Sequence, residues 1–277
     1  MTRVTIFGFG LIGGSLALAL RAAERAFHVT AVDRREILAA PETLASADAC
    51  VAVDDESALS ELLGASDITV LATPVSVIAD KLPWVLDRAR VVTDCGSTKR
   101  HIARRAQSSR HAKRFVPGHP MAGLPGGGAS NAVASLFRGK NWLLCPEGCD
   151  ADAIALVENM VRQTGASIVH MSVEAHDAAV ARTSHLPQLL ASALTLIVEA
   201  HSARDAAGPA FERATLTAGG PAPIWRDIFA SNGDEIARAI GELCATLEPL
   251  AAELATSDRT ELADELLAKA RIIRGRS

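Results

Sequence analysis

The sequence predicts an α/β fold, with a mainly parallel sheet in residues 1–171 and an all-helical C-terminal half in residues 172–277. Two observations carry this prediction. In the first half, short runs rich in β-branched residues alternate with helical segments, which is typical of βαβ units and a parallel sheet. After about Met171 these runs stop, and only helical patterns follow. The chain is therefore expected to form two domains that meet near residue 171.

Seven runs of the first half are expected to be strands: Val4–Phe7, His28–Val32, Ile68–Ala72, Arg90–Thr93, Phe115–Val116, Trp142–Leu144 and Ile168–Met171. The second half is expected to hold helices at Ser172–Ala203, around Phe211–Asn232 and from Asp234 to Ile273. Apolar residues in the last of these recur at three- and four-residue spacing, which gives a helix an apolar stripe. Pro187 predicts a kink in the first of them.

A glycine-rich turn, Gly8-Phe9-Gly10-Leu11-Ile12-Gly13, follows the first expected strand and opens a helix. In such a unit the first glycine permits a tight turn, the second lets the backbone approach a pyrophosphate, and the third lets the helix pack closely on the strand. The pyrophosphate sits at the helix N-terminus, where free N–H groups and the helix dipole favour an anion. The next strand leads to Asp33, about 20 residues after the last glycine, as a dinucleotide-binding domain requires. The first domain is therefore expected to be Rossmann-type.

Asp33 favours NAD as the cofactor, because its carboxylate can bind a ribose diol and repels a 2′-phosphate. The neighbouring Arg34 leaves NADP as the alternative, because an arginine there can accommodate that phosphate. Thr73-Pro74 follows a later strand of the same sheet, and the carboxyl ends of such strands border the cofactor crevice. The residues expected to bind the cofactor are Gly8, Gly10, Leu11, Ile12, Gly13, Asp33, Arg34, Thr73, Pro74 and Gly96.

Composition argues against several other classes of protein. The net charge is −4 and aromatic residues make up 4%, so no nucleic-acid partner is expected. The five cysteines are scattered, and Cys145 and Cys149 have no second pair of ligands nearby, so no metal site is expected. The chain has no apolar run near 18 residues and no signal peptide after Met1, so a cytoplasmic protein without a membrane partner is expected.

The segment from Cys95 to Pro146 contains nine Lys or Arg residues and no Asp or Glu. This charge is expected either to attract a small polyanionic substrate or to form a solvated basic helix face around residues 100–114. The segment holds two polar turns, one around Ser97 and one around His119. Because Pro120 keeps the residue before it out of the helical region, His119 is expected on an extended loop at the carboxyl edge of the sheet. A histidine there can act as a base near working pH.

These pieces together resemble the prephenate/arogenate dehydrogenase family of tyrosine biosynthesis. The resemblance rests on GFGLIGGSLA (8–17), LATPV (71–75), DCGSTK (94–99), GHPMAG (118–123), LFRGKNWLLCP (136–146), HDAAVARTSHLPQLLASAL (176–194) and WRDIF (225–229). The motifs fall in order over nearly the whole chain, and GHPMAG and SHLPQ are specific to the family. The resemblance implies oxidative decarboxylation of prephenate or arogenate, with NAD or NADP as hydride acceptor, to 4-hydroxyphenylpyruvate or tyrosine.

The resemblance also implies roles for individual residues. His119 would polarise or deprotonate the ring hydroxyl as hydride leaves the substrate, and Ser97 would hydrogen-bond that hydroxyl and fix His119. His185 would face the substrate, with Gln188 about one turn further along the same side. The C-terminal helices would form a homodimer, with Trp225 near the joint active site. The small dianionic substrate would need cationic or hydrogen-bonding partners for its two carboxylates, and the reaction would need no metal.

One departure from the family concerns the substrate carboxylate. The family usually carries Thr-Arg upstream of the tryptophan, and by spacing from Trp225 the arginine position holds Leu216. Arg213 lies three residues earlier, on the same face of a helix, and is the expected replacement. Without a replacement, the substrate would be a modified relative of prephenate.

Two other interpretations stay open. A β-hydroxyacid or imine reductase would share the domain plan, but it usually has a catalytic Lys or Asp on the first C-terminal helix, and residues 176–196 contain no Lys. A non-catalytic NAD-binding sensor would fit the altered clamp, whereas the intact His119, Ser97 and His185 argue against it. The sequence leaves the choice between prephenate and arogenate open.

Overall fold

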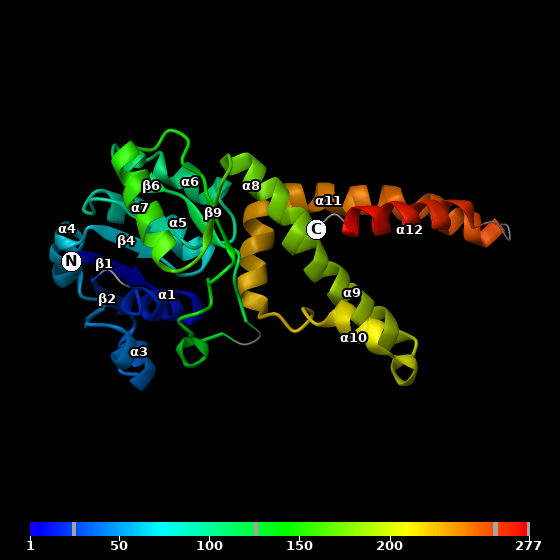
Figure 1. Cartoon of the computed structure of the whole chain (residues 1–277), viewed down its shortest axis with the longest axis horizontal. Helices are drawn as coiled ribbons and strands as arrows, with labels where there is room; N and C mark the ends of the chain where they lie inside the picture. The colour runs from blue at the N-terminus through cyan, green and yellow to red at the C-terminus, as the bar shows by residue number, and fades with distance from the viewer. Residues whose placement is uncertain (24–25, 125–126, 257–259, 276–277) are drawn as a thin grey trace.

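The computed structural model describes residues 1–23, 26–124, 127–256 and 260–275. An α/β part holds the N-terminal half of the chain, and the C-terminal helices extend away from it (Figure 1). This arrangement confirms the predicted fold class.

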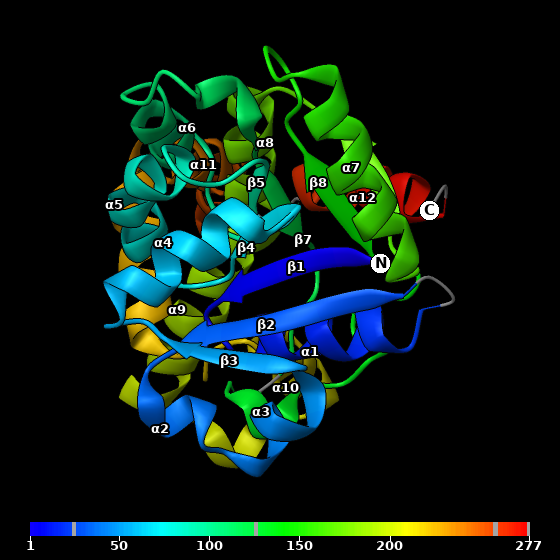
Figure 2. The ribbon, with the colours of Figure 1, turned by 90° about the vertical axis from the view of Figure 1, so that its left-hand side faces the viewer.

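The α/β part is built on a six-stranded sheet in the order β3-β2-β1-β4-β5-β6, with every neighbouring pair parallel. Figure 2 shows most of these strands side by side. The strands are β1 (Thr2–Phe7), β2 (Phe27–Asp33), β3 (Ala49–Ala52), β4 (Ile68–Leu71), β5 (Val92–Asp94) and β6 (Phe115–Val116). Five of them were expected from the sequence, and β3 was not.

Helices cover both faces of this sheet, because strand side chains alternate between the two faces. On β1, Ile6 belongs to the core that α1 and α7 cover, whereas Phe7 belongs to the core under α4, α5 and α6. These helices are α1 (Leu11–Arg21), α4 (Glu56–Ala65), α5 (Val75–Leu86), α6 (Arg100–Ala106) and α7 (Ala151–Gln163). Shorter helical segments are α2 (Arg35–Leu38), α3 (Pro41–Ser46) and the 3₁₀ turns Ala112–Arg114, Ala129–Asn131 and Arg204–Ala206.

A second sheet of three strands lies next to the first, in the order β7-β8-β9. Its strands are β7 (Gly118–Pro120), β8 (Asn141–Leu144) and β9 (Ser167–His170). β7 runs antiparallel to β8, and β8 runs parallel to β9. Residues 142–144 and 168–170 are therefore strands as predicted, but they belong to a separate sheet. The prediction of a loop at His119 was wrong, because this residue is the middle of β7 and pairs with Leu143.

The C-terminal part is helical, with more breaks than predicted. Its helices are α8 (Val173–Val180), α9 (Leu186–Ala200), α10 (Pro209–Thr215), α11 (Ala222–Thr256) and α12 (Glu261–Arg274). A π-helical segment, Ala181–His185, joins α8 to α9 immediately before Pro187, whose ring cannot accommodate the carbonyl of a regular preceding turn. α11 is kinked at Asn232, whose φ is −136°. The helix predicted from Asp234 to Ile273 passes through residues 257–259, which lie outside the described residues.

None of the helices in the described part of the chain has the length and hydrophobicity of a membrane span. The same residues contain no group of three or more His, Cys, Asp or Glu side chains placed to hold a metal ion.

Candidate active site

The turn after β1 has the shape that a dinucleotide phosphate site requires. Gly8 has a φ of +88°, which residues with a side chain rarely adopt. A Cβ on Gly13 would lie 2.0 Å from the carbonyl oxygen of Gly8, so only glycine lets α1 approach β1 this closely. A Cβ on Gly10 would meet no atom within 4 Å, and no side chain caps the start of α1. The first amides of α1 therefore border open space, where an anion such as a pyrophosphate fits.

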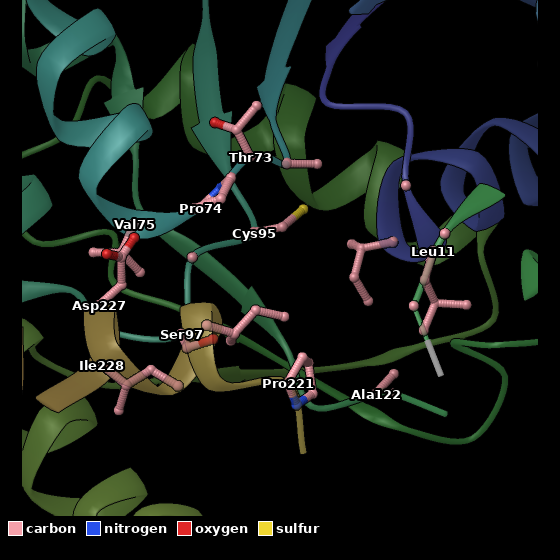
Figure 3. A pocket seen from close by; sticks show the side chains of 18 of the residues that line it. Leu11, Thr73, Pro74, Val75, Cys95, Ser97, Ala122, Pro221, Asp227 and Ile228 are labelled. Carbon is pink, nitrogen blue, oxygen red and sulfur yellow. The ribbon is translucent and has the colours of Figure 1, made fainter. Parts of the chain in front are cut away.

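A pocket of about 390 Å³ opens at this turn and reaches the helical part (Figure 3). Leu11 lies on the opposite side of the pocket from Asp227 and Ile228 of α11. Six residues predicted to bind the cofactor line it, namely Gly10, Leu11, Ile12, Thr73, Pro74 and Gly96. Ser97 lines it as well. The pocket therefore brings the dinucleotide turn next to one of the two residues predicted to act on the substrate.

The other predicted cofactor residues lie behind or beside the pocket. Gly8 and Gly13 shape the turn. Asp33 ends β2, and its carboxylate accepts hydrogen bonds of 2.7 Å from the backbone N–H groups of Phe9 and Arg34. The Arg34 side chain is 74% exposed, with its Nε 4.0 Å from the Asp33 carboxylate. The carboxylate is thus held next to the glycine turn, while the guanidinium lies in solvent.

A buried ion pair between Asp94 and Lys99 joins the Ser97 turn to β7. Both side chains are inaccessible to solvent. The Asp94 carboxylate accepts hydrogen bonds from the backbone N–H groups of Gly96 at 2.9 Å and Gly118 at 3.0 Å. Lys99 Nζ donates to the Gly118 carbonyl oxygen at 2.7 Å. Ser97 and His119 therefore each follow a glycine that is tied to this pair.

His119 is half-buried on β7, and its hydrogen-bond partner is a histidine that the sequence did not single out. His119 Nδ1 lies 2.9 Å from Nε2 of His176, and His176 Nδ1 lies 2.8 Å from a carboxylate oxygen of Asp177. His176 and Asp177 are both fully buried, on α8. Among the described residues no hydrogen bond joins Ser97 to His119, so the partner that orients His119 here is His176.

Burial and neighbouring charges set the protonation of these groups. Burial, together with His176, Lys99 and His185, holds the pKa of His119 well below its usual value. Burial also lowers the pKa of His176, although Asp177 opposes this shift. The pKa of Asp177 is lowered by its hydrogen bonds from His176 and from two backbone N–H groups, which outweigh its burial. The two histidines are therefore neutral and Asp177 is ionised.

His185 closes the π-helical segment and is buried against Trp225, with the two rings edge to face at 6.1 Å. Its Nδ1 lies 3.4 Å from Nδ2 of Asn232, and Arg100 donates to Asn232 Oδ1 at 2.8 Å. Because Arg100 fixes the orientation of this amide, Asn232 Nδ2 is the donor and His185 carries its own proton on Nε2. Burial lowers the pKa of His185 to about 4.

Gln188 and Trp225 meet at the segment that precedes α11. Gln188 is buried on α9, and a Cβ on Gly220 would lie 3.4 Å from its Oε1 and 2.5 Å from Trp225 Nε1. His185, Gln188 and Trp225 thus form one group on the helical side, next to the end of the pocket that Pro221 and Ile228 line.

The positive charges of the segment from Cys95 to Pro146 do not line the pocket, since no Lys or Arg is among its described lining residues. Lys99 is paired with Asp94, and Arg100 with Asp177 and Asp234. Most of the others are exposed, and of the two expectations for this segment the solvated basic face describes them. The clamp candidate Arg213 is also exposed, on α10, outside the pocket lining, and Leu216 is 77% exposed.

Comparisons with known proteins agree with this geometry. Residues 16–170 match the family model described as "Prephenate dehydrogenase, nucleotide-binding domain", and residues 172–268 match the one described as "Prephenate dehydrogenase, dimerization domain". A cyclohexadienyl dehydrogenase of Zymomonas mobilis is 28% identical over 266 residues, which cover 92% of this chain and 89% of that protein. A prephenate dehydrogenase of Bacillus subtilis is 30% identical over 249 residues, which cover 84% of this chain and 65% of that protein.

Solved structures agree as well. The crystal structure of prephenate dehydrogenase from A. aeolicus in complex with hydroxyphenyl propionate and NAD+ superimposes with a TM-score of 0.83 at 27% identity, covering 100% of this chain and 98% of that one. The arogenate dehydrogenase of Synechocystis gives a TM-score of 0.81 at 25% identity, with 99% of each chain covered.

Proposed function

This chain belongs to the prephenate dehydrogenase family, and from that premise we propose which residues carry out its reaction. The enzyme oxidatively decarboxylates prephenate or arogenate, and when NAD is bound its nicotinamide ring accepts the hydride. One observation carries the assignment of roles. His119 is held as a neutral base, beside the Ser97 turn, next to a pocket that begins at the dinucleotide turn. The glycine turn fits that cofactor, because its third glycine admits no side chain and its second borders open space.

His119 acts on the ring hydroxyl of the substrate. Its Nδ1 is engaged by His176, so Nε2 is the nitrogen that can accept the hydroxyl proton. Ser97, on the pocket wall, supplies a hydroxyl that can hydrogen-bond the same oxygen. As the carbinol carbon loses hydride and its oxygen loses the proton, a ring carbonyl forms, and loss of the ring carboxylate as CO2 then makes the ring aromatic.

His185 acts as a hydrogen-bond donor on the other side of the substrate. Its proton lies on Nε2, because Asn232 donates to Nδ1, and its lowered pKa keeps the ring neutral. Together with Gln188 and Trp225 it is placed to hold the polar tail of the substrate. The neutral His119 accepts and the neutral His185 donates, so the two histidines have complementary tasks.

One assay tests the activity. Purified protein is mixed with prephenate or arogenate and with NAD or NADP, and the absorbance of the reduced cofactor is followed. We expect turnover with one of the two substrates, loss of activity in His119→Asn, and an unchanged circular dichroism spectrum in that variant. A wild-type protein that turns over neither substrate would refute the function, and an active His119→Asn would refute the role of this residue.

The cofactor preference follows from Asp33. Its carboxylate is fixed beside the glycine turn by Phe9 and Arg34, in the place where a ribose diol can meet it and a 2′-phosphate is repelled. We expect a higher kcat/KM with NAD than with NADP, and Asp33→Asn is expected to narrow the difference. A wild-type preference for NADP would assign the larger influence to Arg34.

The carboxylate clamp is the least complete part of the site within one chain. We keep Arg213 as the candidate, acting from α10 in the assembled enzyme. Arg213→Ala is then expected to raise KM strongly with a smaller effect on kcat, because it removes binding rather than chemistry. An unchanged KM would remove Arg213 from the site and direct attention to a modified substrate.

The assembled enzyme is a homodimer formed by the C-terminal helices. Large apolar side chains are exposed along α9, α11 and α12, among them Leu196 at 69%, Leu254 at 55% and Leu267 at 67%. A second copy of this chain would cover them, in keeping with the description of the family model that matches residues 172–268. Light scattering is expected to give twice the chain mass of 29.0 kDa. A monomer of unchanged activity would contradict the proposal.

A further inference from the structure

A closed chain of hydrogen bonds runs inward from His119 and ends at a buried carboxylate. His119 Nδ1 lies 2.9 Å from His176 Nε2, and His176 Nδ1 lies 2.8 Å from Asp177 Oδ1. The side chains of His176 and Asp177 are both 0% exposed. The direct action of His119 on the substrate does not by itself require either of them, so their burial behind the base asks for a physical reason.

The protons of this chain are fixed from its inner end. The Asp177 carboxylate accepts hydrogen bonds from the backbone N–H groups of Lys99 at 2.7 Å and Arg100 at 2.9 Å, and from Arg100 Nε at 3.2 Å. With these donors Asp177 stays an anion, so His176 carries its proton on Nδ1 and presents a bare Nε2. His119 must then carry its proton on Nδ1, which leaves its own Nε2 bare.

The proton balance of the proposed reaction gives this arrangement a use. The substrate carbinol loses a hydride from carbon and a proton from oxygen, and the ring then loses CO2. The electron pair left by CO2 flows through the ring to the oxygen, which takes a proton to become the product phenol. No proton is released overall, so the proton taken from the hydroxyl must be kept nearby and returned within the same turnover.

We propose that His176 holds this proton between the two stages of the reaction. The substrate O–H bond breaks as an N–H bond forms at His119 Nε2, and the Nδ1 proton of His119 passes to His176 Nε2. The positive charge then lies on His176, whose Nδ1–H donates to the Asp177 carboxylate. When the phenol oxygen gains its electron pair, both transfers reverse, and His119 regains its starting state. This proposal rests on the function of His119 given above.

The surroundings favour His176 over His119 as the place for the charge. Burial and the nearby Lys99 lower the pKa of His119, and it has no carboxylate partner. His176 has the Asp177 carboxylate at 2.8 Å, which opposes the effect of its own burial. The chain also ends inside the protein, so the stored proton has no direct contact with water. The charged and titratable groups that face the two histidines are Asp177, Lys99, Asp94, Arg100 and His185.

His176→Gln separates storage from orientation, because the glutamine carbonyl can accept from His119 Nδ1 but cannot hold a second proton. We expect kcat to fall about 10- to 100-fold, part of what a general base contributes, while KM stays within about threefold. The acid limb of the kcat profile is expected to move to lower pH, because the base loses its link to Asp177. His170→Gln is the matched control, since His170 is a half-exposed histidine on β9 that pairs with Glu158. It should leave kcat and its pH profile unchanged.

Nitrogen-15 spectra of histidine-labelled wild-type protein test the chain without substrate, and they need no variant to fold. We expect His119 and His176 both to be protonated on Nδ1 and bare on Nε2 near neutral pH. His119 protonated on Nε2 would overturn the proposal, as would a folded His176→Gln with the wild-type kcat profile. If the wild-type enzyme turns over neither substrate, the function of His119 fails, and the spectra still decide whether the chain exists.

Discussion

Lowering the pH from about 7.5 to about 5.5 is expected to destabilise the folded chain, because three histidines of the site are buried in the neutral state. Burial lowers the pKa values of His119, His176 and His185. In the unfolded chain each histidine takes up a proton near its ordinary pKa of about 6.5. The unfolded state therefore binds more protons in this range, and the free energy of unfolding is highest above that pKa and falls as the pH drops below it.

The size of the effect can be worked for His185, whose pKa falls from 6.5 to about 4. Linkage between these two values gives a loss of about 1.3 kcal/mol between about pH 7.5 and about pH 5.5. The residue is 1% exposed, so solvent screening does not reduce this figure much. His119 and His176 act in the same direction, so 1.3 kcal/mol is about the least that the site contributes.

Urea unfolding at the two pH values, followed by circular dichroism at one protein concentration, measures this loss. His185→Gln is the matched variant, because it removes one proton-binding group, and its pH sensitivity should be smaller by about 1.3 kcal/mol. Equal pH sensitivity in the variant and the wild type would refute the reasoning for His185. Stability that rises as the pH falls would refute it for all three histidines.

Two further predictions concern the parts that hold the site in place. Lys99→Met leaves the carboxylate of Asp94 buried without its cation and should lower the free energy of unfolding by about 3–5 kcal/mol, as a broken buried pair does. The exposed Lys140→Met serves as its control in urea unfolding, and an equally small effect of both would contradict the prediction. Gly10→Ala should leave the melting temperature unchanged and weaken NAD binding in calorimetry about tenfold or more, because the new Cβ meets only open space where a pyrophosphate fits. Gly13→Ala should lower the melting temperature itself, since its Cβ would lie 2.0 Å from a backbone carbonyl oxygen, and undiminished NAD binding by Gly10→Ala would argue against the phosphate site.

The sequence predicted the fold class because its strongest patterns are local ones. The strands of the main sheet that carry clear β-branched runs were found, whereas β3 reads Ala-Cys-Val-Ala and has little β-propensity of its own. β7 was missed for a different reason. Gly118-His119-Pro120 has the composition of a loop, and only its pairing with β8 makes it a strand. That pairing depends on residues more than 20 positions away, and local periodicity carries no information about it.

The site was predicted in part, for a related reason. The glycine turn, Thr73-Pro74 and Ser97 occur in recognisable local motifs, and they line one pocket. His176 and Asp177 were visible in the sequence as a neighbouring pair on a helix. Nothing in the sequence indicated that this helix packs behind His119. The interpretation of the basic segment was misleading because Lys99 and Arg100 neutralise buried or neighbouring carboxylates that lie far away in the sequence or behind the turn.

Two buried carboxylates organise this site, and a single residue connects them. The Lys99 ammonium pairs with Asp94, which holds the Ser97 turn and β7, while the Lys99 backbone N–H donates to Asp177, which ends the His119–His176 chain. Each carboxylate accepts at least three hydrogen bonds, which offsets the cost of burying its charge. Because both networks meet at Lys99, a movement of α8 against the sheet would disturb the base and the Ser97 turn together. The residues that act on the two sides of the substrate oxygen are therefore held by one connected framework that spans both parts of the chain.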